Sequence, residues 1–86
     1  MISSIVFAAA LGCIPYQSAL DHFWEQWEEV ITYSAITNNG LILETLVNKE
    51  TTTWTMLLVR PDKMACLLSS GDGWRVVIPP LGDDDA

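Results

Sequence analysis

Positive charge is absent from the first 48 residues of this 86-residue chain, whose four Lys and Arg residues begin at Lys49. Eleven Asp and Glu residues stand against those four, which gives a net charge of -7 at pH 7. Such a negative field repels phosphate groups, so we expect no direct contact with nucleic acid. A chain of this length forms one domain, and a hydrophobic fraction of 50% predicts a real core.

Residues for catalysis are also scarce, and His22 is the single histidine. A zinc site needs at least three convergent ligands, which this pattern does not supply. The sequence also has no glycine-rich phosphate loop and no nucleophile elbow. Cys66 and His22 would make a minimal nucleophile and base, but a thiol in an apolar strand has a raised pKa and is inert. We therefore expect no enzyme, no catalytic residue, no metal and no cofactor.

No hydrophobic run is long enough to cross a bilayer, which takes about 20 apolar residues, so we expect no integral membrane span. Residues 1–12, "MISSIVFAAALG", have the composition of a signal peptide but lack its basic start. Three readings of this segment stay open: a signal-like export sequence, a retained strand or helix, or a lipidation signal at the degenerate lipobox "ALGC". The remaining chain is predicted to be a single domain at 13–80 followed by an acidic tail at 81–86.

Only two cysteines are present, Cys13 after the apolar start and Cys66 inside the run "MACLLSS". If they pair, the protein matures in an oxidising compartment. A bond between them would close a loop of about 54 residues and contribute about 4 kcal/mol to stability.

An amphipathic helix is predicted from Ser18 to about Tyr33, with Ser18 as the N-cap and Asp21 in the first turn. Its acidic face carries Asp21, Glu25, Glu28 and Glu29. The apolar positions recur every three or four residues and are Leu20, Phe23, Trp24, Trp27, Val30 and Ile31.

Extended segments follow the Asn39-Gly40 turn, at residues 41–47, 51–59 and 64–70, with a short fourth at 74–78. Their connections are of hairpin length, so neighbouring strands should be antiparallel. One helix followed by such strands predicts an α+β fold, with the helix packed on a three- to four-stranded antiparallel meander.

Two sets of side chains on residues 51–59 compete to face the helix. One set contains Trp54, Met56 and Leu58, and the other contains Thr55, Leu57 and Val59. The periodicity favours neither set. Because both are largely apolar, the outward set would leave an exposed patch, which is typical of a partner surface or of a surface that the N-terminal segment covers.

The segment "WTMLLVRPDKMACLLSSGDGW" resembles a class of small exported or phage-associated proteins of alphaproteobacteria. Those proteins combine a Cys, an amphipathic helix, a W-T strand, a P-D-G turn, an A-C-L strand and a G-x-x-W end. The present chain departs from them at Lys63, where the turn of the class has Gly. The resemblance implies the helix-plus-meander fold and a Cys13–Cys66 disulfide, and it implies no activity.

Contact with a protein partner, or self-association, is the function that these features favour, with Trp dominating such interfaces. The candidate contact residues are Trp24, Glu25, Glu28, Trp54 and Trp74. The helix and strand spacings also explain the three Trp residues by core packing, which is the default reading. The first hypothesis is a small non-enzymatic protein of the cell envelope, secreted space (periplasm or extracellular) or phage virion. The alternative is a cytosolic acidic inhibitor that mimics DNA toward a basic host protein.

Overall fold

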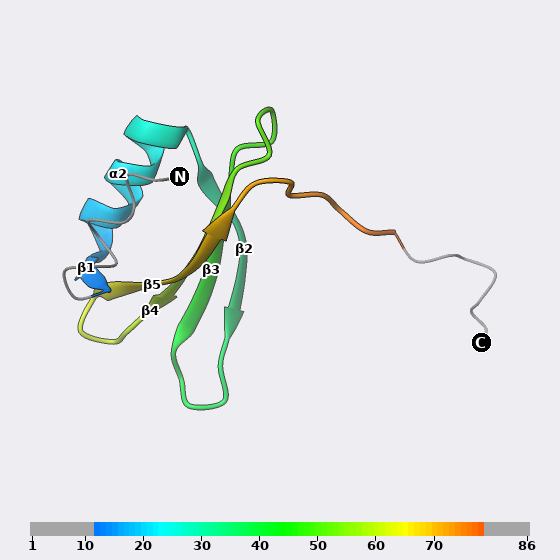
Figure 1. Ribbon diagram of the computed structural model, residues 1–86. Helices are drawn as coiled ribbons and strands as arrows, with labels where there is room; N and C mark the ends of the chain where they lie inside the picture. Colours follow the sequence, from blue (N-terminus) through cyan, green and yellow to red (C-terminus); the bar gives the residue numbers. More distant parts are fainter. Residues whose placement is uncertain (1–11, 79–86) are drawn as a thin grey trace, which may run out of the picture.

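The computed structural model describes residues 12–78, in which one helix, α2 (Tyr16–Trp27), lies on one face of a sheet (Figure 1). The predicted α+β class is confirmed. The signal-like start, apart from Gly12, and the acidic tail at 81–86 lie outside the described residues. The sheet has five strands, namely β1 (Cys13–Pro15), β2 (Val30–Ile36), β3 (Ile42–Val47), β4 (Trp54–Val59) and β5 (Met64–Gly71).

All neighbouring strands are antiparallel, in the order β1-β5-β4-β3-β2. The prediction of three or four strands was therefore wrong. The three strands predicted at 41–47, 51–59 and 64–70 are present as β3, β4 and β5, with slightly different ends. The two strands that the sequence did not reveal, β1 and β2, form the two edges of the sheet.

The predicted helix was six residues too long at its C-terminal end, because α2 stops at Trp27. Glu28 adopts a left-handed conformation with φ of 52°, and the Glu29 N–H donates to the Phe23 carbonyl, which completes the last turn. The chain then extends into β2, where Val30 and Ile31 lie. Their spacing from Trp27 fits a helix, but the β-branched composition of "VITYSAI" and pairing with β3 favour a strand.

The predicted N-cap was also wrong, because α2 starts at Tyr16 and Ser18 lies within its first turn. Pro15 occupies the cap position with φ of -55°, and no side chain caps the helix. The Tyr16 N–H donates instead to the Lys63 carbonyl, so the neighbouring hairpin accepts one of the free amides of the helix start.

The helix covers the face of β4 that carries Thr55, Leu57 and Val59, which are all buried. Across the sheet, Leu46 lies opposite Thr55 and Ala65 lies opposite Val59. The buried cluster between the two layers consists of Ala19, Phe23, Leu46, Leu57, Val59 and Ala65.

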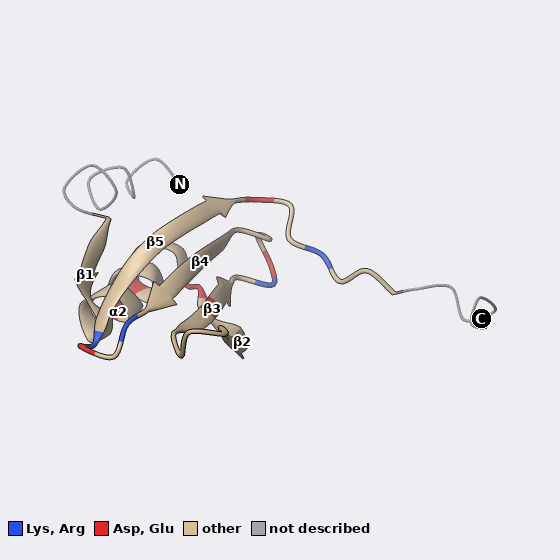
Figure 2. Cartoon of the chain, turned by 90° about the horizontal axis from the view of Figure 1, so that it is seen from below, with Lys and Arg blue, Asp and Glu red and all other residues tan. Residues whose placement is uncertain are grey.

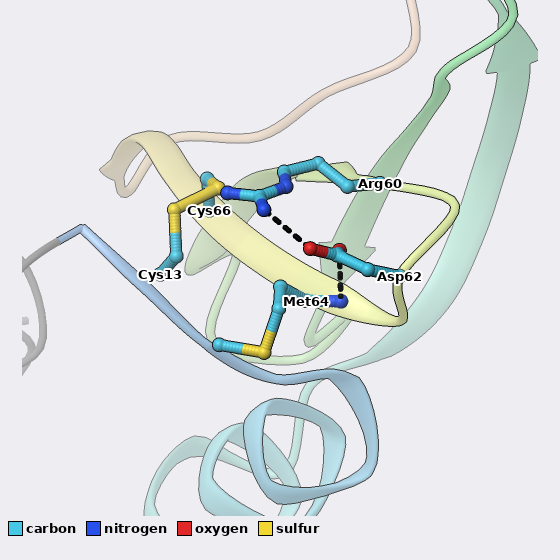
Figure 3. Close-up of a disulfide and its surroundings, with 5 residues drawn as sticks. All are labelled: Cys13, Arg60, Asp62, Met64 and Cys66. Atoms are coloured by element: carbon cyan, nitrogen blue, oxygen red, sulfur yellow. Dashed lines mark hydrogen bonds and ion pairs between the residues drawn. A yellow bond between two sulfur atoms is a disulfide. The ribbon is translucent and has the colours of Figure 1, made fainter.

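A disulfide joins Cys13 and Cys66, which confirms the pairing that the resemblance implied (Figure 3). The two residues are direct cross-strand partners in β1 and β5, and their Cα atoms are 3.8 Å apart. The Leu67 N–H donates to the Gly12 carbonyl beside them. Hydrogen-bonded and non-hydrogen-bonded pairs alternate along an antiparallel ladder, so the neighbouring cysteines form a non-hydrogen-bonded pair. The Cα atoms of two antiparallel strands are closest at such pairs.

The turn that precedes β5 contains the predicted Pro61-Asp62 step, and Lys63 there has φ of 67°. A positive φ at a residue other than Gly costs about 1 kcal/mol. Asp62 supports the turn, because it pairs with Arg60 and accepts a hydrogen bond from the Met64 N–H (Figure 3). Desolvation is the largest single influence and acts to raise the pKa of Asp62. The interactions with Arg60 and the Met64 N–H together outweigh it, so the pKa lies below its ordinary value.

Residues 74–78 do not form the predicted fourth strand of the meander. β1 and its Gly12 extension occupy part of the edge of β5 that a returning strand would need. The segment leaves the sheet instead (Figure 1). It is held at its start by a hydrogen bond from the Trp74 N–H to the Thr52 carbonyl.

Candidate interaction site at the β2 edge

The five predicted contact residues fall into two groups on different parts of the molecule. Trp24 and Glu25 lie on α2, and Glu28 caps it; all three are exposed. Trp54 belongs to β4 and points to the face of the sheet opposite the helix, and Trp74 follows β5. The structure therefore does not bring the five residues together into one site.

Trp54 and Trp74 act mainly in packing on the face of the sheet that the helix does not cover. The Trp54 ring lies over Gly71, where an added Cβ would come within 3.2 Å of it. The ring of Trp74 contacts that of Tyr33, with centroids 5.5 Å apart. Thr45 and Val47, on this same face, are buried. These aromatic rings thus cover part of the apolar patch that the sequence predicted here.

Trp24 has a different environment, because 54% of its surface is exposed at the mouth of a cleft between α2 and β2. The cleft has a volume of about 300 Å³. We call it the edge cleft, and its lining is Leu20, Asp21, Trp24, Glu29, Val30, Ile31 and Leu46. Its walls are mostly apolar, although Asp21 and Glu29 contribute carboxylates. Such a cleft suits an apolar side chain of another protein.

Glu29 lies in the edge cleft at the point where α2 passes into β2, and it is only 1% exposed. Neither of its carboxylate oxygens has a hydrogen-bond partner of good geometry among the described residues. Burial raises the pKa of Glu29, and the hydroxyls of Thr55 and Thr53 reduce this effect without cancelling it. A buried carboxylate of this kind costs stability when it is charged.

Beside the cleft, β2 forms an edge of the sheet. The Thr37 N–H donates to the Leu41 carbonyl at the hairpin end. In an antiparallel ladder, every second residue of a strand points its N–H and C=O groups toward the neighbouring strand. Counting back from Thr37, these residues in β2 are Ala35 and Tyr33, whose backbone groups point toward β3. The N–H and C=O groups of Ser34 and Ile36 point away from the sheet, where no described strand pairs with them.

No charged residue interrupts β2, whose seven residues read "VITYSAI" (Figure 2, tan throughout). Natural edge strands are usually protected by a charge, a proline or a short length. The protection here is limited to a bulge between Ile31 and Tyr33. The side chains of Val30, Ile31, Tyr33 and Ile36 are all exposed, with Ile36 at 78%. An uncharged, exposed edge strand is a template for an additional strand.

The acidic residues of the first half are not all available to a partner. Glu29 and Glu44 are buried, whereas Asp21, Glu25 and Glu28 are exposed. Glu44 accepts hydrogen bonds from the Tyr16 hydroxyl at 2.9 and 3.1 Å, which tie the start of α2 to β3. Burial, with the hydrogen bond and the negative charge of Glu44, raises the pKa of Tyr16 to about 12.

The nucleophile and base pair considered from the sequence, Cys66 with His22, is not formed in the structure. Cys66 is in the disulfide, so it offers no thiol nucleophile to His22. His22 packs edge-on against Phe23, with ring centroids 4.8 Å apart. No group of three or more His, Cys, Asp or Glu side chains within residues 12–78 is placed to hold a metal ion. No helix in this range has the length and apolar character to cross a membrane.

Trp24 was identified from the sequence, but the β2 strand, which forms the other wall of the edge cleft, was not. The signal was present, since "VITYSAI" combines three β-branched aliphatic residues with Thr and Tyr. The helical spacing of Val30 and Ile31 concealed it.

Comparison of the chain with protein-family models, with curated proteins and with solved structures finds no match.

Proposed function

We propose that this protein is a non-enzymatic binding protein, which acts through contacts between the β2 edge and another polypeptide in the cell envelope, the secreted space or a virion. The observation that supports this most is the edge cleft, where the exposed ring of Trp24 meets exposed Val30 and Ile31 beside an uncharged edge strand. Backbone groups of the edge supply affinity, and the cleft supplies side-chain specificity.

The proposed location rests on the disulfide. A bond between Cys13 and Cys66 persists in an oxidising compartment and is rare in the cytosol. The mass of the intact protein, isolated from its native compartment without reductant, tests this. The proposal expects the mass to rise by two hydrogens on reduction. Two free thiols in the native material would contradict it.

The alternative, an acidic inhibitor of a basic protein, has less support. Two of the five acidic residues in the first half of the chain, Glu29 and Glu44, are buried and present no charge to a partner. A DNA mimic depends on an ordered array of exposed charges, and binding would weaken steeply with salt. Binding at the β2 edge is mainly apolar, so salt should not weaken it.

A photo-cross-linking residue at Ile31 tests the site of contact in the native compartment. The matched control carries the same residue at Leu68, which is similarly exposed on β5. We expect an adduct from position 31 that the control does not form and that Trp24→Ala weakens. Equal adducts from both positions, or no adduct with any polypeptide, would overturn the proposed function.

A further inference from the structure

The β2 strand has complementary features at its two ends. Near its start, Ile31 forms one wall of the edge cleft beneath Trp24. At its end, Ile36 projects an isoleucine side chain that is 78% exposed. Ile31 lies opposite Leu46, Ile36 lies opposite Ile42, and Ser34 lies opposite Glu44, so all three side chains belong to the helix-covered face of the sheet.

We propose that the partner of the β2 edge is a second copy of this chain, joined through antiparallel pairing of the two β2 strands. This inference rests on the proposed function and names the polypeptide that occupies the site. The two-fold axis passes at Ser34, whose backbone groups point outward and bond to those of Ser34 in the other copy. The two sheets then continue as one ten-stranded sheet with both helices on the same face.

This register brings the two complementary features together. With Ser34 opposite its own copy, residues whose numbers sum to 68 face each other, so Ile36 of one copy lies opposite Thr32 of the other. Its side chain then sits on the helix-covered face beside Ile31 and the edge cleft. The symmetry repeats the contact at the other end. A shift of the axis to Ala35 would place Ile36 opposite Ser34 and leave the cleft unfilled.

Charge permits a second copy at this place but not over most of the surface. Two chains of net charge -7 repel each other over most of their surfaces. The β2 strand has no charged residue, so two copies can meet there without opposing like charges directly. Pairing also satisfies the outward backbone groups of Ser34 and covers the exposed Ile31, Tyr33 and Ile36 side chains.

Sedimentation equilibrium of the purified, disulfide-bonded chain over a range of concentrations tests the proposal. We expect a monomer–dimer equilibrium in which Ile36→Asp raises the dissociation constant at least 100-fold. The control Ile78→Asp places the same charge at an equally exposed isoleucine outside the sheet and should leave it unchanged. Circular dichroism confirms that both variants fold.

The register has its own test, because paired residues at the axis have Cα atoms about 5.5 Å apart, which suits a disulfide. Under mild oxidation, Ser34→Cys should form a covalent dimer, and Asn38→Cys in the adjacent turn should not. A chain that stays monomeric at all concentrations, or a dimer that Ile36→Asp does not weaken, overturns the proposal. If the chain is monomeric while position 31 cross-links to a different protein, the second copy is wrong and the proposed function stands.

Discussion

The two edges of the sheet are protected in opposite ways. β1 is three residues long, ends in Pro15 and is joined to β5 by a disulfide. β2 is seven residues long, has no charge or proline and exposes apolar side chains. Natural sheets protect edges against pairing with other chains, and here the β2 edge has only a bulge for that protection. We therefore assign stability to the β1 edge, and the proposed function assigns contact to the β2 edge.

Removing the disulfide should have the largest effect on this contrast. The variant with Cys13→Ala and Cys66→Ala should lose about 4 kcal/mol of unfolding free energy, since the bond closes a long loop in the unfolded chain. Urea denaturation of the variant and the oxidised parent measures this. A loss below about 1 kcal/mol would show that β1 is held mainly by its backbone ladder and by α2.

Tyr16 links the start of α2, next to β1, to Glu44 on β3 near the centre of the sheet. Tyr16→Phe removes the hydroxyl that donates to buried Glu44, so we expect a loss of about 2 kcal/mol in unfolding free energy. Tyr33→Phe is the matched control, because Tyr33 is half exposed and should change stability little. Equal losses for the two variants would argue against a specific role for the Tyr16–Glu44 pair.

Glu29, which lies where α2 passes into β2, should make the stability of the protein depend on pH. Because its pKa is raised by folding, the folded state holds a proton that the unfolded state has already lost. Stability should therefore fall as pH rises from about 4.5, the ordinary value, through the raised pKa of the folded state. Glu29→Gln should remove this component and increase stability at neutral pH by about 1 kcal/mol.

Thermal unfolding between pH 4 and 8 measures the effect, with Glu25→Gln as the exposed control. If Glu29→Gln leaves the pH profile of the parent unchanged, the buried carboxylate has no such role.

Local patterns predicted much of the centre of the fold and little of its edges. The hairpin turns and alternating apolar residues identified β3, β4 and β5. The helix was recognised from Leu20, Phe23 and Trp27, but its end was not, because Val30 and Ile31 fit a helical period and a strand equally well. Pairing with β3, a contact between distant residues, decides that competition in favour of β2.

The candidate site was predicted only in part for the same reason. Trp24 was identified as a contact residue, but the cleft around it exists because α2 stops and the chain turns back beside it as β2. β1 was missed because three residues carry no periodicity, and only its ladder and disulfide with β5 define it.

Amide hydrogen exchange at low and high protein concentration tests the contrast between the two edges most directly. We expect the amide of Ser34 to exchange fast in dilute protein and to become protected as the protein concentration rises. The amides that bond β1 to β5, including that of Leu67, should be equally protected at both concentrations. Fast exchange of the Ser34 amide at every concentration, or protection already present in the monomer, would contradict the β2 edge as a self-association surface.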